Sequence, residues 1–107
     1  MMIVTYKTNL NILKNCLKSV DSKIKILIIE NSNFFDDKQE IQKEFSNVEV
    51  LCTGSNLGYG AGNNFGLKQV KTRYALILNP DIVCNNDFFL NIVEGNNSLK
   101  VKYFTQF

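Results

Sequence analysis

The chain has 107 residues, with 12 Lys+Arg against 10 Asp+Glu, a net charge of +2 and no histidine. This length predicts one domain over residues 1–107. A composition of 45% hydrophobic and 21% charged residues is that of a globular protein, and the small net charge argues against a nucleic-acid partner. The lack of histidine excludes Ser-His-Asp triads, Cys-His pairs and His-ligated zinc.

The cysteines and the N-terminal residues indicate a reducing compartment. Cys16, Cys52 and Cys84 are widely spaced and form no C-x-x-C pair, so we predict reduced, buried, small apolar side chains. The start of the chain lacks the basic and apolar regions of a signal peptide, and no apolar run approaches the ~20 residues that span a bilayer. We therefore expect a cytoplasmic protein, with peripheral contact at the inner face of the membrane as a further option.

Strands are predicted where short apolar runs meet turn residues. Residues 2–6, 24–29, 48–52 and 74–78 are such runs. The second run is nearly all apolar at its end, which is typical of a strand covered on both faces.

Helices are predicted between these strands. Asn9 is a suitable cap for a first helix, whose apolar positions recur every three or four residues. These positions are Leu10, Leu13, Cys16, Leu17 and Val20. Apolar spacing also predicts helices around 41–45, over 63–70 and over 86–93, whereas residues 99–107 fit either a strand or a frayed end.

This alternation predicts an α/β fold, Rossmann-like, with a mainly parallel sheet and helices on both faces. Ligands of such sheets bind outside the carboxyl ends of the strands, near the point where the strand order reverses. The segments just after the strands are therefore candidates for a site. They are residues 5–7, 30–32, 53–62 and 79–81.

The glycine-rich segment at residues 56–66 has two interpretations. Its Gly58-Tyr59-Gly60 follows the third predicted strand and does not continue as G-x-G-x-x-G, so it is not the dinucleotide fingerprint. Its amides could face an anion at the start of a helix. Alternatively, the glycines only shape a turn.

Two acidic residues at strand ends also have two interpretations each. Asp81 follows Pro80 after an apolar strand, where it could hold Mg²⁺ or Mn²⁺ against phosphates or could merely form an Asx turn. Glu30 could accept a hydrogen bond from a base or ribose, or could be a solvated strand end. Thr5 and Tyr6 could face a base or could simply pack.

Five short motifs in register resemble one known family. They are Ile3-Val4-Thr5-Tyr6, Cys16-Leu17-x-Ser19, Ile28-Ile29-Glu30-Asn31-Ser32, Asn56-x-Gly58-x-x-x-Gly62-Asn63-Asn64-x-Gly66 and Leu78-Asn79-Pro80-Asp81. Over residues 2–94 the chain resembles the nucleotide-binding half of a family 2 glycosyltransferase of GT-A fold, in particular its rhamnosyltransferase-like branch.

The resemblance implies roles for individual residues. The implied donor nucleotide-binding residues are Thr5, Tyr6, Glu30, Asn31, Asn56, Gly58, Asn64 and Asn79. Glu30 occupies a position where the family usually carries an Asp that contacts the base, and it is one methylene longer. Asp81 matches the metal-contacting carboxylate of the D-x-D motif, with Mg²⁺ or Mn²⁺ as the implied cofactor, while Asn79 replaces the first acid.

The resemblance also implies a function and what completes it. The expected partners are a nucleotide diphosphate-sugar donor and a glycan or lipid-linked acceptor, in cell-surface polysaccharide synthesis. Family members continue into an acceptor-binding half that carries the catalytic base, whereas residues 99–107 contain no acid. We therefore expect the 107-residue chain to be a truncated, donor-binding half with little or no activity alone, and a partner chain to supply the acceptor half.

Two alternatives to an active enzyme are considered. One is a non-catalytic module that binds nucleotide sugars or docks on a partner, for which Tyr103, Phe104 and Phe107 would offer an apolar surface. The other is a degenerate product without activity.

Overall fold

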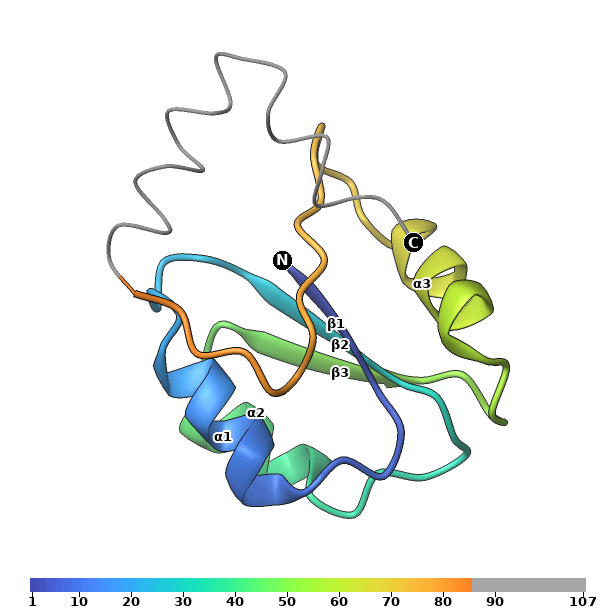
Figure 1. The fold of residues 1–107 in the computed structure, drawn as a ribbon, viewed down its shortest axis with the longest axis horizontal. Helices are drawn as coiled ribbons and strands as arrows, with labels where there is room; N and C mark the ends of the chain where they lie inside the picture. Colours follow the sequence, from blue (N-terminus) through green and yellow to red (C-terminus); the bar gives the residue numbers. More distant parts are fainter. Residues whose placement is uncertain (86–107) are drawn as a thin grey trace.

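The computed structural model describes residues 1–85. Strands and helices alternate along the chain (Figure 1). They are β1 (Met2–Thr5), α1 (Leu10–Lys18), β2 (Ile26–Glu30), α2 (Lys38–Glu44), β3 (Val48–Cys52) and α3 (Tyr59–Leu67). The three strands form a parallel sheet in the order β1-β2-β3, so their carboxyl ends lie at one edge.

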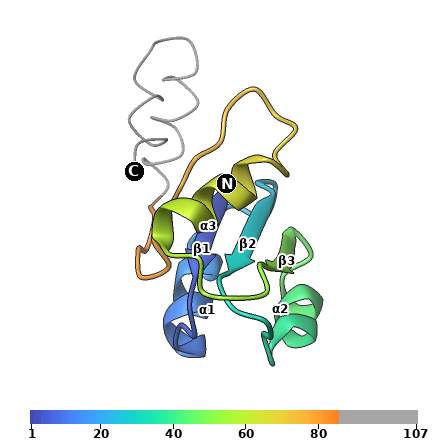
Figure 2. The same ribbon diagram turned by 90° about the vertical axis from the view of Figure 1, so that its right-hand side faces the viewer.

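Helices cover both faces of this sheet, with α3 on one side and α1 and α2 on the other (Figure 2). Because successive strand residues face opposite sides, each strand contributes to two cores. The core under α1 and α2 includes Ile3, Leu13, Leu17, Ile28, Ile41 and Val50. The core under α3 is smaller and includes Met2, Val4 and Ile29. The predicted α/β fold class is confirmed.

The predicted fourth strand at residues 74–78 is reduced to a single bridge. Met2 N donates to Leu76 O at 2.7 Å, Leu78 N donates to Met2 O at 3.0 Å, and Met2 pairs with Ile77 in parallel. The segment thus lies along the free edge of β1, but only Met2 pairs with it, so the strand prediction was wrong in extent. The chain adds β2 and β3 on one side of β1 and residues 76–78 on the other, which places the switch in strand order beside β1.

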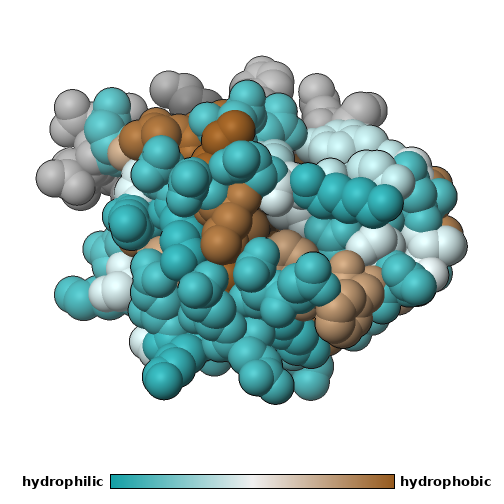
Figure 3. Space-filling view, turned by 90° about the horizontal axis from the view of Figure 1, so that it is seen from below, coloured by the Kyte–Doolittle hydropathy of each residue, from teal (hydrophilic) through white to brown (hydrophobic). Residues whose placement is uncertain are grey.

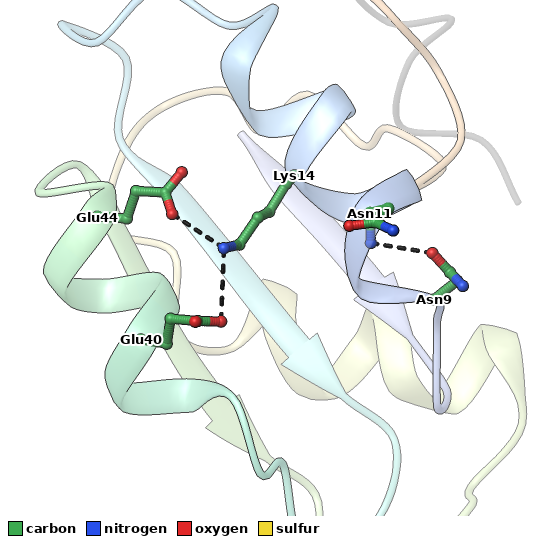
Figure 4. Close-up of polar contacts among 5 residues, drawn as sticks. All are labelled: Asn9, Asn11, Lys14, Glu40 and Glu44. Carbon is green, nitrogen blue, oxygen red and sulfur yellow. Dashed lines mark hydrogen bonds and ion pairs between the residues drawn. The ribbon is translucent and has the colours of Figure 1, made fainter.

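Helix α1 begins as the sequence predicts. The Asn9 side chain accepts a hydrogen bond from Asn11 N at 2.9 Å (Figure 4). It also accepts one from Ile12 N at 3.2 Å, which confirms its capping role. On the same helix, Lys14 Nζ lies 2.9 Å from Glu44 Oε1 and 3.4 Å from Glu40 Oε2. This ion pair joins α1 to α2 above the sheet.

Helix α3 packs on the sheet through glycines. A Cβ added at Gly66 would lie 2.3 Å from Met2 Sδ and 2.8 Å from Ile29 Cγ1, so no larger side chain fits there. At Gly62 the same atom would lie 3.1 Å from Asn31 Nδ2. The helix begins at Tyr59, earlier than the predicted residue 63, because these close contacts fix a glycine-rich turn that propensity alone disfavours.

The outer edge of β3 is partly covered by α2. The Gln42 side chain accepts a hydrogen bond from Val50 N at 2.9 Å, and Phe45 O accepts one from Val48 N at 3.0 Å. Two amides of an edge strand are therefore paired within the chain.

The surface seen from below is mostly hydrophilic, with a narrow band of hydrophobic residues between the polar regions (Figure 3). This is the expected pattern for helices that turn one apolar face toward a sheet. Among residues 1–85, no helix has the length and apolar character needed to cross a bilayer. The predicted last helix and the tail at 99–107 lie outside the described residues, as do Tyr103, Phe104 and Phe107.

Candidate functional site

The carboxyl ends of β1 and β2 are joined by a buried carboxylate. Thr5 and Glu30 are register partners in the sheet, and Thr5 Oγ1 donates to Glu30 Oε1 at 2.7 Å. The other carboxylate oxygen, Oε2, accepts hydrogen bonds from Ser32 Oγ and, at 3.4 Å, from Lys7 N. Glu30 is 1% exposed and Thr5 2%. Glu30 is therefore bonded within the chain at both oxygens.

The next residue, Asn31, joins the end of β2 to the glycine-rich loop. Its Nδ2 donates to Gly58 O at 2.8 Å, and its Oδ1 accepts from Thr53 Oγ1 and Leu57 N, both at 3.0 Å. Gly58 precedes α3 with a φ of 87°, a conformation that favours glycine. Asn31, at 2% exposed, thus fixes the loop that leads into α3.

The glycine-rich loop is joined in turn to the segment after Leu78. Tyr59 OH donates to Asn79 Oδ1 at 3.1 Å. Within the loop, Gly58 N donates to Asn56 Oδ1 at 3.0 Å. A continuous set of hydrogen bonds therefore connects the four strand-end segments that the sequence singles out, beginning at Thr5 and ending at Asn79.

The predicted site residues divide by exposure. Thr5, Glu30 and Asn31 are buried, and their polar atoms are engaged within the chain. The exposed members are Tyr6, Asn56, Gly58, Asn64, Asn79 and Asp81. The structure brings Thr5 and Glu30 into contact. Asn64 lies on α3, whereas Asp81 comes two residues after Asn79, whose backbone oxygen is 4.0 Å from Cys16 Sγ of α1. The assignment of these residues to donor binding stays a prediction.

Three further polar residues belong to this arrangement and had no predicted role of their own. The single hydroxyl proton of Ser32 is shared between Glu30 Oε2 and Phe34 O, the latter at 3.0 Å, and Thr53 Oγ1 donates to Asn31 Oδ1. Asn63 is 0% exposed, and its Nδ2 donates to Tyr59 O at 3.0 Å. Their position next to a strand end or a glycine was the available signal.

The cysteines are free, as predicted, but only Cys16 is fully buried. Cys52 and Cys84 are half-buried, which corrects the expectation that all three would be buried. Cys52 is the last residue of β3, and Cys84 lies in the irregular segment after Pro80. Burial raises the pKa of the Cys16 thiol to about 11, with smaller contributions from Cys84 and Asp81. Burial also raises the pKa of Cys84. These two thiols are therefore protonated and poor nucleophiles at neutral pH.

Comparison with known proteins places this geometry in a family. The model of glycosyl transferase family 2 matches residues 1–98. A low-salt glycan biosynthesis hexosyltransferase of Haloferax volcanii, Agl10, is 27% identical over 90 residues, which cover 80% of this chain and 28% of that protein. The crystal structure of S. aureus TarS matches with a TM-score of 0.71 at 16% identity, over 90% of this chain and 19% of that one.

These matches differ in what they show. The likeness to TarS is one of fold, because the sequence identity is low. The chain spans less than a third of the length of either protein. The family model, in contrast, covers most of the chain and all the strand-end segments described above. The chain therefore belongs to glycosyl transferase family 2.

Proposed function

We propose that this chain is the donor-binding half of a GT-A glycosyltransferase of the rhamnosyltransferase-like branch. It binds a nucleotide diphosphate-sugar whose sugar passes to a glycan or lipid-linked acceptor in cell-surface polysaccharide synthesis. The observation that carries the proposal is the hydrogen-bonded connection from Thr5 to Asn79 at the carboxyl ends of the strands. It lies where the strand order reverses, which is the usual ligand position in such sheets.

The buried and exposed residues have different roles in this proposal. The buried side chains hold the ends of β1, β2 and the glycine-rich loop in fixed positions. The exposed side chains of Tyr6, Asn56, Asn64 and Asn79, together with the backbone of Gly58, supply the contacts to the donor. An aromatic ring such as Tyr6, 49% exposed, offers a face on which a base can stack.

Asp81 is the proposed contact to a divalent ion. Within residues 1–85, no group of three or more His, Cys, Asp or Glu side chains could hold a metal. A Mg²⁺ ion bound together with phosphates keeps several waters and needs only one or two protein carboxylates. The exposed carboxylate of Asp81, next to Asn79, fits that requirement. A Mg²⁺ or Mn²⁺ ion there would neutralise charge on the leaving diphosphate.

Transfer to an acceptor also requires a catalytic base, which we place outside the described residues. Deprotonation of the acceptor hydroxyl needs a base on the face of the sugar opposite the diphosphate. We place that base in an acceptor-binding half, on the same protein or on a partner chain. In this proposal the donor half works in the cytoplasm, where peripheral contact with the membrane would bring it to lipid-linked acceptors.

Calorimetry with UDP, dTDP and GDP, each with and without Mn²⁺, tests donor binding and the role of Asp81. We expect one diphosphate nucleotide to bind the 107-residue chain more tightly when Mn²⁺ is present. In Asp81→Ala, the gain from Mn²⁺ is lost because its protein ligand is gone.

Asp36→Ala removes another exposed carboxylate and is the matched control, which should keep the response to Mn²⁺. Failure of all three nucleotides to bind would overturn the donor-binding proposal. An undiminished response to Mn²⁺ in Asp81→Ala would overturn the metal assignment alone.

A further inference from the structure

Both carboxylate oxygens of Glu30 are hydrogen-bonded within the chain and buried. Its Oε1 accepts from Thr5 Oγ1, its Oε2 accepts from Ser32 Oγ and Lys7 N, and the residue is 1% exposed. A base or ribose that bonded to this carboxylate would have to enter a position that is closed to solvent. The side chain is therefore built into the sheet end.

The carboxylate also meets the most unusual backbone conformation beside β1. Lys7 has a φ of 49°, and it is the only non-glycine residue with positive φ among residues 1–85. Such a conformation persists in a non-glycine residue only when its surroundings fix it. The Glu30 carboxylate accepts from the amide of that residue, and Tyr6 lies between Lys7 and Thr5, both of which Glu30 contacts.

We propose that Glu30 is a positioning residue that ties the Thr5–Lys7 turn to the end of β2 and does not contact the nucleotide. Through this tie it sets the backbone that carries the exposed Tyr6 ring. This role rests on the proposed donor binding, since it assigns the recognition of the base to groups other than the carboxylate.

Two substitutions separate positioning from direct contact. In Glu30→Gln the amide oxygen can still accept from Lys7 N and Ser32, and the amide nitrogen can donate to Thr5 Oγ1, whose hydroxyl also accepts. In Glu30→Asp the negative charge remains, but the side chain is one methylene too short to reach both Thr5 and Lys7. Positioning requires the length of the side chain, whereas contact with a base requires the negatively charged acceptor that Glu30→Asp keeps.

Nucleotide calorimetry then gives opposite results for the two roles. For positioning, Glu30→Gln binds the preferred diphosphate nucleotide within about threefold of wild type and keeps the same order among UDP, dTDP and GDP. Glu30→Asp loses roughly tenfold or more, the effect expected for one buried hydrogen bond to a charged group. A reversed result, with Glu30→Asp near wild type and Glu30→Gln weakened or changed in base preference, would overturn the proposal.

Amide hydrogen exchange tests the hydrogen bond between Lys7 N and the Glu30 carboxylate in the absence of any ligand. We expect the Lys7 amide to exchange faster in Glu30→Asp and at nearly the wild-type rate in Glu30→Gln, while amides in the middle of β2 stay protected in both. If wild type binds no nucleotide, the donor-binding proposal fails, and the exchange data still decide whether Glu30 holds the turn. An unchanged Lys7 rate in Glu30→Asp would show that it does not.

Discussion

The helices pack on the two faces of the sheet in different ways. On the α1 and α2 face, large apolar side chains such as Leu13 and Ile41 fill the core, and Lys14 pairs the two helices. On the α3 face, the core is small and the helix approaches through Gly62 and Gly66. The loop that leads into α3 is fixed by hydrogen bonds of Asn31. Apolar volume thus stabilises one face, while close backbone approach positions α3 and the glycine-rich loop on the other.

The largest loss of stability is expected on the α1 and α2 face, where large apolar side chains fill the core. Leu13 is 0% exposed, and Leu13→Ala should lower the free energy of unfolding by about 2–5 kcal/mol through lost burial and a cavity. Chemical denaturation measures this loss. Because Leu13 does not belong to the α3 face, the nucleotide affinity of the folded chain should remain at the wild-type value. A weakened affinity would show that the two faces are not separate in function.

A smaller loss of stability, but a larger effect on the site, is expected from Gly66→Ala. The new methyl group would press against Met2 Sδ and Ile29 Cγ1, and overpacking of this kind costs about 1–3 kcal/mol. Since α3 or the buried side chains of Met2 and Ile29 must shift to relieve the contact, the free energy of unfolding should fall, and a shift of α3 would also lower the nucleotide affinity. Denaturation and calorimetry measure the two effects.

Gly60→Ala provides the matched control in the same helix. A Cβ at Gly60 meets nothing within 4 Å, so this change should be neutral or stabilise the helix by up to about 1 kcal/mol. Equal behaviour of the two alanine variants would contradict the close-packing account of α3.

The smallest effect is expected from the ion pair. A hydrogen bond with Glu44, together with the charges of Glu40 and Glu44, raises the pKa of Lys14 above its ordinary 10.5, although partial desolvation opposes this. Its stabilising contribution is therefore present below pH 10.5 and is lost as the pH rises through the higher pKa of the folded state. Lys14→Met should be slightly less stable than wild type at neutral pH, because exposed ion pairs contribute little.

Thermal unfolding of wild type and Lys14→Met across this range measures the contribution. The difference in midpoint should shrink above pH 10.5, whereas Lys18→Met, at the exposed end of α1, should show no such trend. A difference that persists at high pH would mean that the Lys14 side chain stabilises by packing rather than by charge.

The sequence predicted the parts of the fold that depend on local pattern. The cap at Asn9 and the apolar positions of α1 follow from short-range spacing, and the structure confirms both. The start of α3 and the single bridge at Met2 depend on what packs beside them. Glycine-rich residues 59–62 have low helix propensity, and only the contacts of Gly62 and Gly66 with the sheet make their helical conformation understandable.

The sequence predicted which segments meet at the carboxyl ends of the strands, but not the contacts among them. The rule that ligands bind at these ends selected four segments, and the structure joins them by hydrogen bonds. It could not show that the oxygens of Glu30 are bonded to Thr5, Ser32 and Lys7, because those partners depend on the register of β1 against β2. The sequence pattern of a polar residue at a strand end is the same whether its side chain contacts a ligand or another part of the chain.

The Gln42 side chain at the outer edge of β3 opposes the addition of a further strand to the sheet at that edge. An extended peptide that tried to lengthen the sheet at that rim would have to displace Gln42 before it could pair with the Val50 amide. Growth into ribbons or fibrils from that side therefore faces a built-in competitor.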